Sequence, residues 1–300
     1  MKCLVTGGAG FIGSNLVDSL IERGDEVVII DNLSNGKKEN INPKAKFIQA
    51  DIRNINEIKD YFEGIDYVFH LAALASVQPS IEDPVGYNEV NTNGTLNVLL
   101  CAKNAGVKKI VYSASSAAYG DQKVMPLAET MPAHPISPYG LQKYVGELYC
   151  RMFSDVYGLP TVSLRYFNVY GERQPIQGAY TSVLGIFTRQ RLNNESLTIV
   201  GDGEQKRDYT NVVDVVQANI LAAENDNVRN GEVINIGRGN SYSVNEVADM
   251  FSGPKIYLPE RLEPKDSLAD NTLAKNLLGW TPSIDLPKWI EEYKLKQNIK

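Results

Sequence analysis

A glycine-rich loop near the start of the chain has the residue types and spacing of a phosphate-binding site. Residues 7–13, Gly-Gly-Ala-Gly-Phe-Ile-Gly, satisfy both the G-x-G-x-x-G and the G-x-x-G-x-x-G spacing. Positions without side chains let the backbone approach a pyrophosphate, and the N-terminus of the following helix offers unpaired N–H groups. The loop therefore predicts a dinucleotide site formed by Gly7, Gly10, Phe11, Ile12 and Gly13.

Acidic residues follow the glycine loop at the ends of the next two predicted strands. Asp31 lies 18 residues after Gly13, where a carboxylate can accept hydrogen bonds from both ribose hydroxyls. Its charge repels a 2′-phosphate and Asn32 brings no cation, so the pattern favours NAD over NADP. Asp51 and Ile52 are predicted near the adenine, although Asp51 could also be a turn residue at a strand end.

A tyrosine and a lysine one helical turn apart form the candidate catalytic pair. Tyr139 and Lys143 lie in the first turns of a helix that Ser137 is expected to cap, so they share one helix face. Tyr119 and Lys123 have the same spacing, but they span a turn-like stretch. We interpret that second pair as a chance occurrence.

The Tyr139–Lys143 pair suits proton transfer with the tyrosine as the base. A free tyrosine has a pKa near ~10 and is a poor base at neutral pH. A nearby ammonium and a cationic nicotinamide ring both favour the phenolate and can lower this pKa by ~3 units. Ser115, just past the strand predicted at 109–113, is expected to share the proton of a substrate hydroxyl. A cap of the following loop is the alternative interpretation of Ser115.

Histidine and cysteine usage excludes several other chemistries. His70 and His134 are the two histidines, and they form neither an H-E-x-x-H motif nor a zinc-spaced cluster. No metal site is therefore expected. Cys3, Cys101 and Cys150 are odd in number and far apart, as expected of reduced core residues in a cytoplasmic protein.

The elements that must position these residues alternate between strands and helices. Such alternation implies right-handed crossovers and a parallel sheet, so we expect an α/β fold with a Rossmann-like, doubly wound sheet. Strands are predicted at 2–6, 26–30, 46–50, 67–71, 109–113 and 161–166, and helices at 11–23, 54–63, 84–105 and after 137.

The pattern changes after about residue 168, which predicts a second, smaller lobe. Residues 168–208 are rich in turn residues, and residues 241–300 form short pieces that include a capping box at 243–246. We expect a dinucleotide-binding domain of residues 1–167 and 209–240. Residues 168–208 and 241–300 would form the C-terminal substrate-binding lobe.

The amino-acid composition limits the classes of partner that the protein is expected to bind. The 300 residues are 43% hydrophobic and 22% charged, which is sufficient for a core without disulfide or metal support. With 30 basic and 36 acidic residues and no basic block, nucleic acid is not an expected partner. The absence of an 18-residue apolar window predicts no membrane span, and the first apolar run is too short for a signal peptide.

The motif set resembles that of the extended short-chain dehydrogenases/reductases. Two later segments, 164–168 and 201–209, narrow the resemblance to the nucleotide-sugar branch, in which the UDP-hexose 4-epimerases match best. The resemblance covers nearly the whole chain, and its motifs are specific in combination. It is carried by residues 6–13, Asp31, 71–73, 91–94, 113–116 and 137–143.

The resemblance implies how the catalytic residues act. Tyr139 would take the proton of the sugar 4-hydroxyl, Lys143 would hold the nicotinamide ribose, and Ser115 would orient the hydroxyl. A hydride would pass to NAD, and the resulting ketone would turn in the pocket and take it back on its other face. Further implied cofactor contacts are Leu71, Ala72, Ala73, Asn91 and Tyr166.

The resemblance also implies which residues bind the diphosphate of the substrate. Asn168 and Arg207 would grip it, with Arg261 as a helper, whereas plain surface solvation is the alternative for each arginine. The family usually has an Arg-Pro-Gly-like turn near the last position. This chain has Glu-Arg-Leu-Glu-Pro at 260–264, which leaves the register of Arg261 open.

Related enzymes that catalyse other reactions differ from this chain at particular residues. Related 4,6-dehydratases have an Asp-Glu pair where this chain has Ser116-Ala117, and related decarboxylases have a Glu in that loop. A one-way nucleotide-sugar reductase or dehydrogenase is the alternative enzyme. A non-catalytic NAD-binding regulator is the alternative of another class, but the presence of Ser115, Tyr139 and Lys143 argues against it.

The resemblance also predicts substrate breadth. In such epimerases a bulky residue beside the C2 substituent restricts the enzyme to UDP-glucose and UDP-galactose, and a small residue also admits the N-acetylated pair. The matching residue is Ser267, and Ser76 and Gln174 match positions that line the N-acetyl site. We therefore expect activity on both pairs. The alternative is that Ser267 is an ordinary loop residue and that Gln174 faces water.

Relatives of this kind form homodimers through two helices from each subunit. The corresponding segments are about 86–105 and 138–157, and both have enough apolar positions to pack in a four-helix bundle. A homodimer is the expected assembly.

Overall fold

A seven-stranded parallel sheet forms the centre of the computed structural model, which describes residues 1–178, 181–260 and 264–299. The strands are β1 (Lys2–Thr6), β2 (Glu26–Asp31), β3 (Lys46–Gln49), β4 (Tyr67–His70), β5 (Lys109–Ser115), β6 (Thr161–Tyr166) and β11 (Asn230–Ile236). Their order is β11-β6-β5-β4-β1-β2-β3, which is the Rossmann order with one strand added at an edge. The predicted fold class is confirmed.

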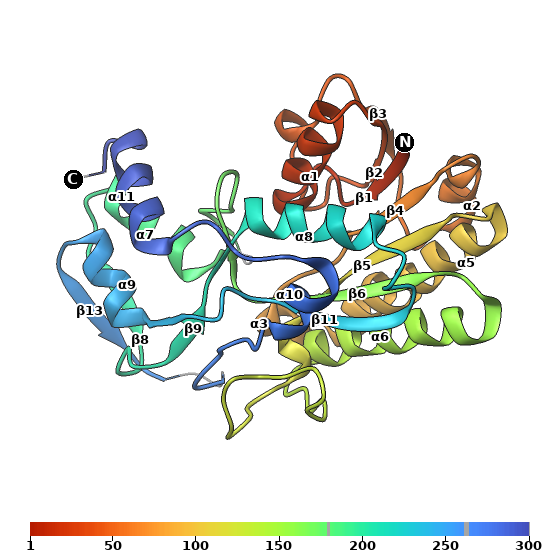
Figure 1. Ribbon diagram of the computed structural model, residues 1–300. Coiled ribbons are helices and arrows are strands. Elements are labelled where there is room, and N and C mark those ends of the chain that lie inside the picture. The colour runs from red at the N-terminus through yellow and green to blue at the C-terminus, as the bar shows by residue number, and fades with distance from the viewer. Residues whose placement is uncertain (179–180, 261–263, 300) are drawn as a thin grey trace.

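Helices cover both faces of the sheet (Figure 1). One face packs against α1 (Phe11–Glu22), α8 (Val212–Glu224) and α10 (Thr272–Leu278), and the other against α2 (Ile55–Ile58), α5 (Thr95–Ala105) and α6 (Pro138–Tyr157). Because both faces are covered, the strands are almost continuously buried, as in other parallel sheets.

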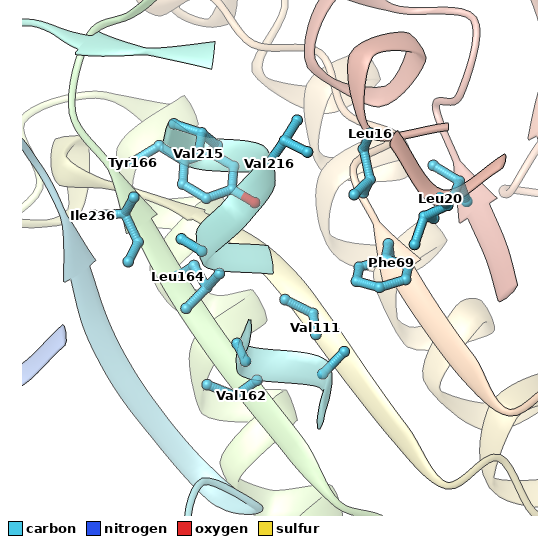
Figure 2. Packing of buried hydrophobic residues seen from close by; sticks show 14 of the residues in the cluster. Leu16, Leu20, Phe69, Val111, Val162, Leu164, Tyr166, Val215, Val216 and Ile236 are labelled. Atoms are coloured by element: carbon cyan, nitrogen blue, oxygen red, sulfur yellow. The ribbon is translucent and has the colours of Figure 1, made fainter. Parts of the chain in front are cut away.

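Apolar residues at helical spacing explain why α1 and α8 lie on this sheet. Figure 2 shows Leu16 and Leu20 of α1 near Phe69 of β4, while Val215 of α8 lies close to Leu164 of β6. All five side chains are completely buried. The glycine loop and the start of α1 are therefore held on a rigid base.

The helix that carries the candidate catalytic pair begins where the sequence predicts. Ser137 accepts a hydrogen bond from the Gly140 N–H (3.1 Å), and Pro138 occupies the first turn. The helix ends at Gly158, which has φ of 66°. This start places Tyr139 in the first turn and Lys143 in the second.

The long helix predicted after Pro84 is interrupted. The chain forms α4 (Pro84–Asn88), then the π-helical turn η3 (Glu89–Gly94), and then α5. The Thr95 hydroxyl donates to the Asn91 carbonyl (2.7 Å) at this point. Such π-turns are frequent at functional sites. The helix predicted at 54–63 is likewise divided, into α2 and the 3₁₀ turn η2 (Lys59–Phe62).

A smaller lobe lies to one side of the sheet, around α7 (Val183–Leu192), α9 (Val244–Phe251) and α11 (Leu286–Lys296) (Figure 1). It has its own apolar core, which includes Phe187 and Phe251. The capping box predicted at 243–246 is confirmed at the start of α9. The short strand pairs are β7 (Val169–Tyr170) with β10 (Thr210–Asn211), β9 (Lys206–Asp208) with β12 (Ser241–Ser243), and β8 (Leu197–Val200) with β13 (Lys255–Leu258).

The three cysteines are free and buried, as predicted. Within the described ranges, no helix is long and apolar enough to cross a membrane, and no group of His, Cys, Asp and Glu could hold a metal ion.

Candidate active site

A cavity of about 680 Å³ opens at the carboxyl ends of the strands. Its lining includes the glycine loop after β1 and the loop after β4, and the sheet order reverses between these two strands, where open α/β sheets bind ligands. The structure brings most of the predicted site residues together here. Those that line the cavity are Gly7, Gly10, Phe11, Ile12, Gly13, Asp31, Asn32, Asp51, Ile52, Leu71, Ala72, Ala73, Ser76, Ser115, Tyr139, Lys143, Tyr166, Asn168, Arg207 and Ser267.

The glycine loop has no space for side chains. Gly7 has φ of 73°, and a Cβ there would lie 2.7 Å from the Ala72 nitrogen. A Cβ on Gly13 would collide with the Gly7 carbonyl. The loop therefore packs directly on the loop after β4 and presents bare backbone at the start of α1. These features fit the pyrophosphate of a dinucleotide.

Asp31 lies inside the cavity at the end of β2. Its side chain is 7% exposed and accepts hydrogen bonds from the N–H groups of Ala9 (3.0 Å) and Leu33 (2.8 Å). Burial raises the pKa of Asp31, whereas the two N–H groups oppose that change. The fixed carboxylate suits a pair of ribose hydroxyls. Three lining residues beside it, Ser34, Asn35 and Gly36, were not predicted, although their turn-forming types directly after the acid could have indicated them.

Asp51 lines the same end of the cavity and is paired within the protein. Arg53 donates to it through Nε (3.0 Å) and Nη2 (2.7 Å), and Asn32 donates through Nδ2 (2.9 Å). The Arg53 guanidinium lowers the pKa of Asp51 to about 2. The carboxylate is therefore ionised and held in place. Its contact with an adenine stays a prediction.

The candidate base is held from two sides. The Tyr139 N–H donates to the Ser80 Oγ (3.1 Å) on α3 (Val77–Glu82). Burial raises the pKa of Tyr139, and a hydrogen bond with the Ser115 side chain opposes that rise. The hydroxyls of Tyr139 and Ser115 therefore face a common point in the cavity.

Lys143 lies one turn after Tyr139 on α6, and its predicted effect on the pKa of that tyrosine stays a prediction. Its Nζ donates to the Ser113 carbonyl (2.7 Å) and lies 5.0 Å from the centre of the Tyr112 ring. Among the protein's own groups, desolvation has the largest effect on Tyr139 and raises its pKa. Burial also lowers the pKa of Lys143 to about 8. Lys143 is thus buried, whereas Tyr139 is half-buried and lines the cavity.

Ser115 caps the following turn and also lines the cavity, and its contact with a substrate hydroxyl stays a prediction. It is the last residue of β5, which extends two residues beyond the predicted strand. Its Oγ accepts a hydrogen bond from the Ala117 N–H (3.2 Å), which caps the turn η4 (Ser116–Ala118). The same side chain lines the cavity.

Asn91, which was predicted to contact the cofactor, does not line the cavity. It is buried behind the loop after β4, where it accepts from the Leu74 N–H (2.8 Å) and donates to the Leu74 carbonyl (3.0 Å). Its Nδ2 also donates to Gln142 Oε1 (3.1 Å) on the catalytic helix α6. Asn91 therefore fixes the loop that lines the cavity. Periodicity could not reveal this, because the π-turn η3 changes the direction of the side chain.

A buried histidine supports the same loop. The Thr6 hydroxyl is 2.7 Å from His70 Nδ1, and His70 Nε2 is 2.9 Å from the Thr95 hydroxyl. The Ala72 N–H donates to Thr6 (3.2 Å). Burial lowers the pKa of His70 to about 3, so the ring is neutral. A neutral ring accepts from one hydroxyl and donates to the other.

Asn168 and Arg207 lie at the substrate-lobe side of the cavity. Asn168 has φ of 29° and donates from Nδ2 to the Asp208 carbonyl (2.9 Å). Arg207 Nη1 donates to the carbonyls of Lys206 and Lys265, both at 2.9 Å. The arginine is thus anchored at the cavity wall rather than extended into solvent.

The residues predicted beside the sugar differ in whether they line the cavity. Ser76 and Ser267 line the cavity, and the Ser267 Oγ is buried with no hydrogen-bond partner among the described residues. Gln174 is 7% exposed, so it does not face water, but it is not among the lining residues. Within the same residues its side-chain oxygen and nitrogen both lack partners. Arg261 lies outside the described residues.

The fold and this site define a member of the NAD dependent epimerase/dehydratase family, and the chain belongs to it: the match covers residues 3–237. The resemblance found in the sequence is confirmed. The protein is therefore an enzyme of this family and NAD is its cofactor, which agrees with the glycine cradle and with Asp31.

Individual relatives are similar over the full length. A protein from Methanocaldococcus jannaschii described as a putative UDP-glucose 4-epimerase is 44% identical, covering 96% of this chain and 95% of its own. A UDP-glucose 4-epimerase from Thermotoga maritima, crystallised with UDP-glucose, is 43% identical with a TM-score of 0.94, covering 99% of this chain and 100% of its own. A UDP-N-acetylglucosamine 4-epimerase from Methanobrevibacter ruminantium M1, in complex with UDP-N-acetylmuramic acid, is 40% identical with a TM-score of 0.92, covering 99% and 98%.

Proposed function

We propose that the protein is a UDP-hexose 4-epimerase that interconverts UDP-glucose and UDP-galactose with bound NAD. The observation that carries this proposal is one cavity that joins the glycine cradle and Asp31 to Ser115, Tyr139 and Lys143. The full-length similarity to UDP-glucose 4-epimerases supports the choice of reaction.

Different residues of the protein have different roles in the proposed reaction. The backbone of the glycine loop would hold the pyrophosphate of NAD and Asp31 would hold a ribose. When bound, NAD supplies the hydride acceptor and, in its oxidised form, a positive charge that favours the tyrosine phenolate. Tyr139 removes the proton of the sugar 4-hydroxyl and later returns it. Ser115 would orient that hydroxyl toward Tyr139, since both side chains line the same cavity.

The cavity lacks the acid that a dehydratase would need near Tyr139. Among the described lining residues the carboxylates are Asp31, Asp51 and Asp266. The first two lie at strand ends on the β2–β3 side of the sheet, and Asp266 accepts a hydrogen bond from the Lys206 N–H (3.3 Å). Residues 116 and 117 are Ser and Ala, so elimination at C5 and C6 has no acid–base pair there.

A direct test is incubation with UDP-glucose without added NAD, followed by analysis of the released sugar. An epimerase gives UDP-galactose with no net change in NADH absorbance. Stoichiometric consumption of added NAD would instead identify the one-way dehydrogenase. Absence of turnover in protein that retains NAD would favour the regulator.

We extend the proposal to UDP-GlcNAc and UDP-GalNAc. A serine at position 267 leaves space for an N-acetyl group that a tyrosine ring would fill, and a relative named as a UDP-N-acetylglucosamine 4-epimerase supports this breadth. Ser267→Tyr should abolish the acetylated reaction and largely spare UDP-glucose, because the clash affects only the larger sugar. The ratio of the two kcat/KM values measures this effect. If the unmodified enzyme cannot interconvert the acetylated pair, this extension is wrong.

Three further parts of the proposal concern the division of the chain into two lobes, its assembly and its location in the cell. We infer that residues 1–167 and 209–240 bind NAD and that 168–208 and 241–300 bind the nucleotide sugar, since both parts contribute to the cavity. We also infer a homodimer through α5 and α6. The free, buried cysteines favour a cytoplasmic location, which fractionation of source cells would check.

A further inference from the structure

A buried asparagine at the edge of the sheet has an unusually complete set of hydrogen bonds. Asn235 lies on β11 and its exposed fraction is 0%. Its Nδ2 donates to the carbonyls of Leu127 (2.8 Å) and Asp270 (3.1 Å), and its Oδ1 accepts from the Tyr119 hydroxyl (2.8 Å). Its backbone N–H donates to Glu129 Oε1 (2.8 Å). Asn235 does not line the cavity, so it can act there only through these partners.

Two of these partners belong to one wall of the cavity, which consists of Leu127 and residues 266–270 and is called here the substrate wall. Leu127 donates to the Leu268 carbonyl (2.7 Å), and the Asp270 N–H donates to the Leu127 carbonyl (2.9 Å). Leu127, Asp266 and Ser267 line the cavity. The Asn235 amide therefore holds both segments of this wall against strand β11.

The third partner connects Asn235 to the catalytic helix. The Tyr119 ring lies 4.4 Å from the Arg165 guanidinium, and Arg165 forms a bidentate pair with Glu147 (2.8 and 2.7 Å). Glu147 lies one turn after Lys143 on α6 and is 2% exposed. The second Tyr-x-x-x-Lys pair in the sequence thus contributes a structural tyrosine to a buried polar network.

We propose that Asn235 is a positioning residue for the sugar: it sets the distance between the substrate wall and the catalytic strand β5. This inference rests on the proposed epimerase function. The position requires an amide, because one end of the side chain must donate to two carbonyls while the other accepts from a hydroxyl. A carboxylate has the same shape but would place an oxygen opposite two carbonyl oxygens.

The test compares Asn235→Asp with Tyr119→Phe. Each variant removes buried hydrogen bonds at the same asparagine, but Tyr119→Phe leaves both bonds to the substrate wall in place. Asn235→Asp should raise the KM for UDP-glucose about tenfold, with a smaller change in kcat. Tyr119→Phe should leave KM within about twofold, because a bond outside the wall is lost. Both variants should retain bound NAD, since the glycine loop and Asp31 are untouched.

Two measurements, the thermal unfolding midpoint and KM, separate positioning from a general loss of stability. Thermal unfolding should show a lower midpoint for both variants, whereas KM should change only in Asn235→Asp. Equal KM changes in the two variants, or an unchanged KM in Asn235→Asp, would overturn the proposal. If Asn235→Asp is insoluble, Asn235→Ala removes the same two donors without repulsion and should show the same KM effect. An inactive unmodified enzyme would instead contradict the proposed function.

Discussion

At the scale of single residues, the proposed reaction requires Tyr139 to lose a proton from a half-buried position at the cavity wall. Burial raises its pKa, and the hydrogen bond with Ser115 only partly opposes this. The protein alone therefore keeps the tyrosine neutral, and the phenolate becomes accessible when cationic groups are added in the cavity. Such an arrangement limits proton removal to the loaded site.

Tyr139→Phe tests the assignment of the base. Phenylalanine keeps the ring and removes only the hydroxyl, so we expect the fold and the NAD content to be retained. Turnover of UDP-glucose should fall by ~10²–10⁴-fold, the usual contribution of general base catalysis. Initial rates and absorbance of bound nucleotide measure the two effects. A variant within tenfold of the unmodified enzyme would show that another group removes the proton.

The burial of Lys143 predicts how the stability of the protein depends on pH. Its pKa is lowered from 10.5 to about 8 by burial, so between these values the unfolded chain binds a proton that the folded protein has released. Stability from this group therefore rises as pH increases from 8 to 10.5, and the buried charge costs up to about 3 kcal/mol at pH 7.

Lys143→Met should remove that cost together with the activity. We expect its free energy of unfolding at pH 7 to be about 1–3 kcal/mol higher, since the Ser113 carbonyl also loses a donor. Urea unfolding of nucleotide-free protein at pH 7 and pH 10 measures the difference, which should shrink at the higher pH. An increase in the free energy of unfolding that is equal at pH 7 and pH 10 would be inconsistent with an effect of the Lys143 charge.

The sequence could predict those residues whose chemistry depends on local spacing. Gly7, Gly13, Asp31, Tyr139 and Lys143 stand in motifs with a defined strand–loop–helix context, and all line the cavity. Asn91 and Leu127 show what spacing cannot predict. The π-turn moves Asn91 behind a loop, and Leu127 reaches the cavity only through contacts with residues more than a hundred positions away.

At the scale of elements, the start of α6 determines where the base lies. Ser137 caps this helix, and Tyr139 follows within the first turn. Loss of the cap frees the Gly140 N–H, which lies next to the base in the chain. The geometry of the site therefore depends on one side-chain hydrogen bond outside the reacting groups.

Ser137→Ala should lower the free energy of unfolding by about 1 kcal/mol and should also reduce turnover. Ser243→Ala is the matched control, because Ser243 caps α9 in the small lobe with the same kind of bond to the Glu246 N–H (3.1 Å). The control should show a similar loss of stability in urea and unchanged turnover. Equal turnover in the two variants would mean that the α6 cap does not position Tyr139.

Element boundaries were predictable where the local signals agree. Ser137-Pro138 and the capping box at 243–246 identified two helix starts, and apolar runs identified six of the seven strands of the central sheet, all but β11. The division of 84–105 was not predicted: the π-turn at 89–94 contains one apolar residue, Val90, so apolar spacing gives no signal there. The short strand pairs of the small lobe depend on partners far apart in the sequence, as with β8 and β13.

At the scale of the whole molecule, one face of helix α6 is exposed among the residues that the structure describes. Leu141 and Leu148 of α6 are both 51% exposed, and Val156 is 65% exposed. These residues are seven and eight positions apart, so they form a stripe along the helix. The opposite side of α6 carries Lys143 and packs on β5. A stripe of this kind, behind the catalytic pair, is the surface on which we infer that a second copy packs.

Leu148→Glu should convert the inferred dimer into a monomer, because two like charges would face each other near the centre of a symmetric interface. Light scattering at micromolar concentration should give twice the chain mass for the unmodified protein and the single chain mass for the variant. Leu295→Glu on α11 is the matched control: Leu295 is 75% exposed, lies in the small lobe and should leave the dimer intact. Since Leu148 makes little contact within its own chain, its substitution should change the stability of the isolated subunit by less than about 0.5 kcal/mol. An unmodified protein that is already monomeric would exclude this assembly, and α6 would then present its apolar stripe to solvent.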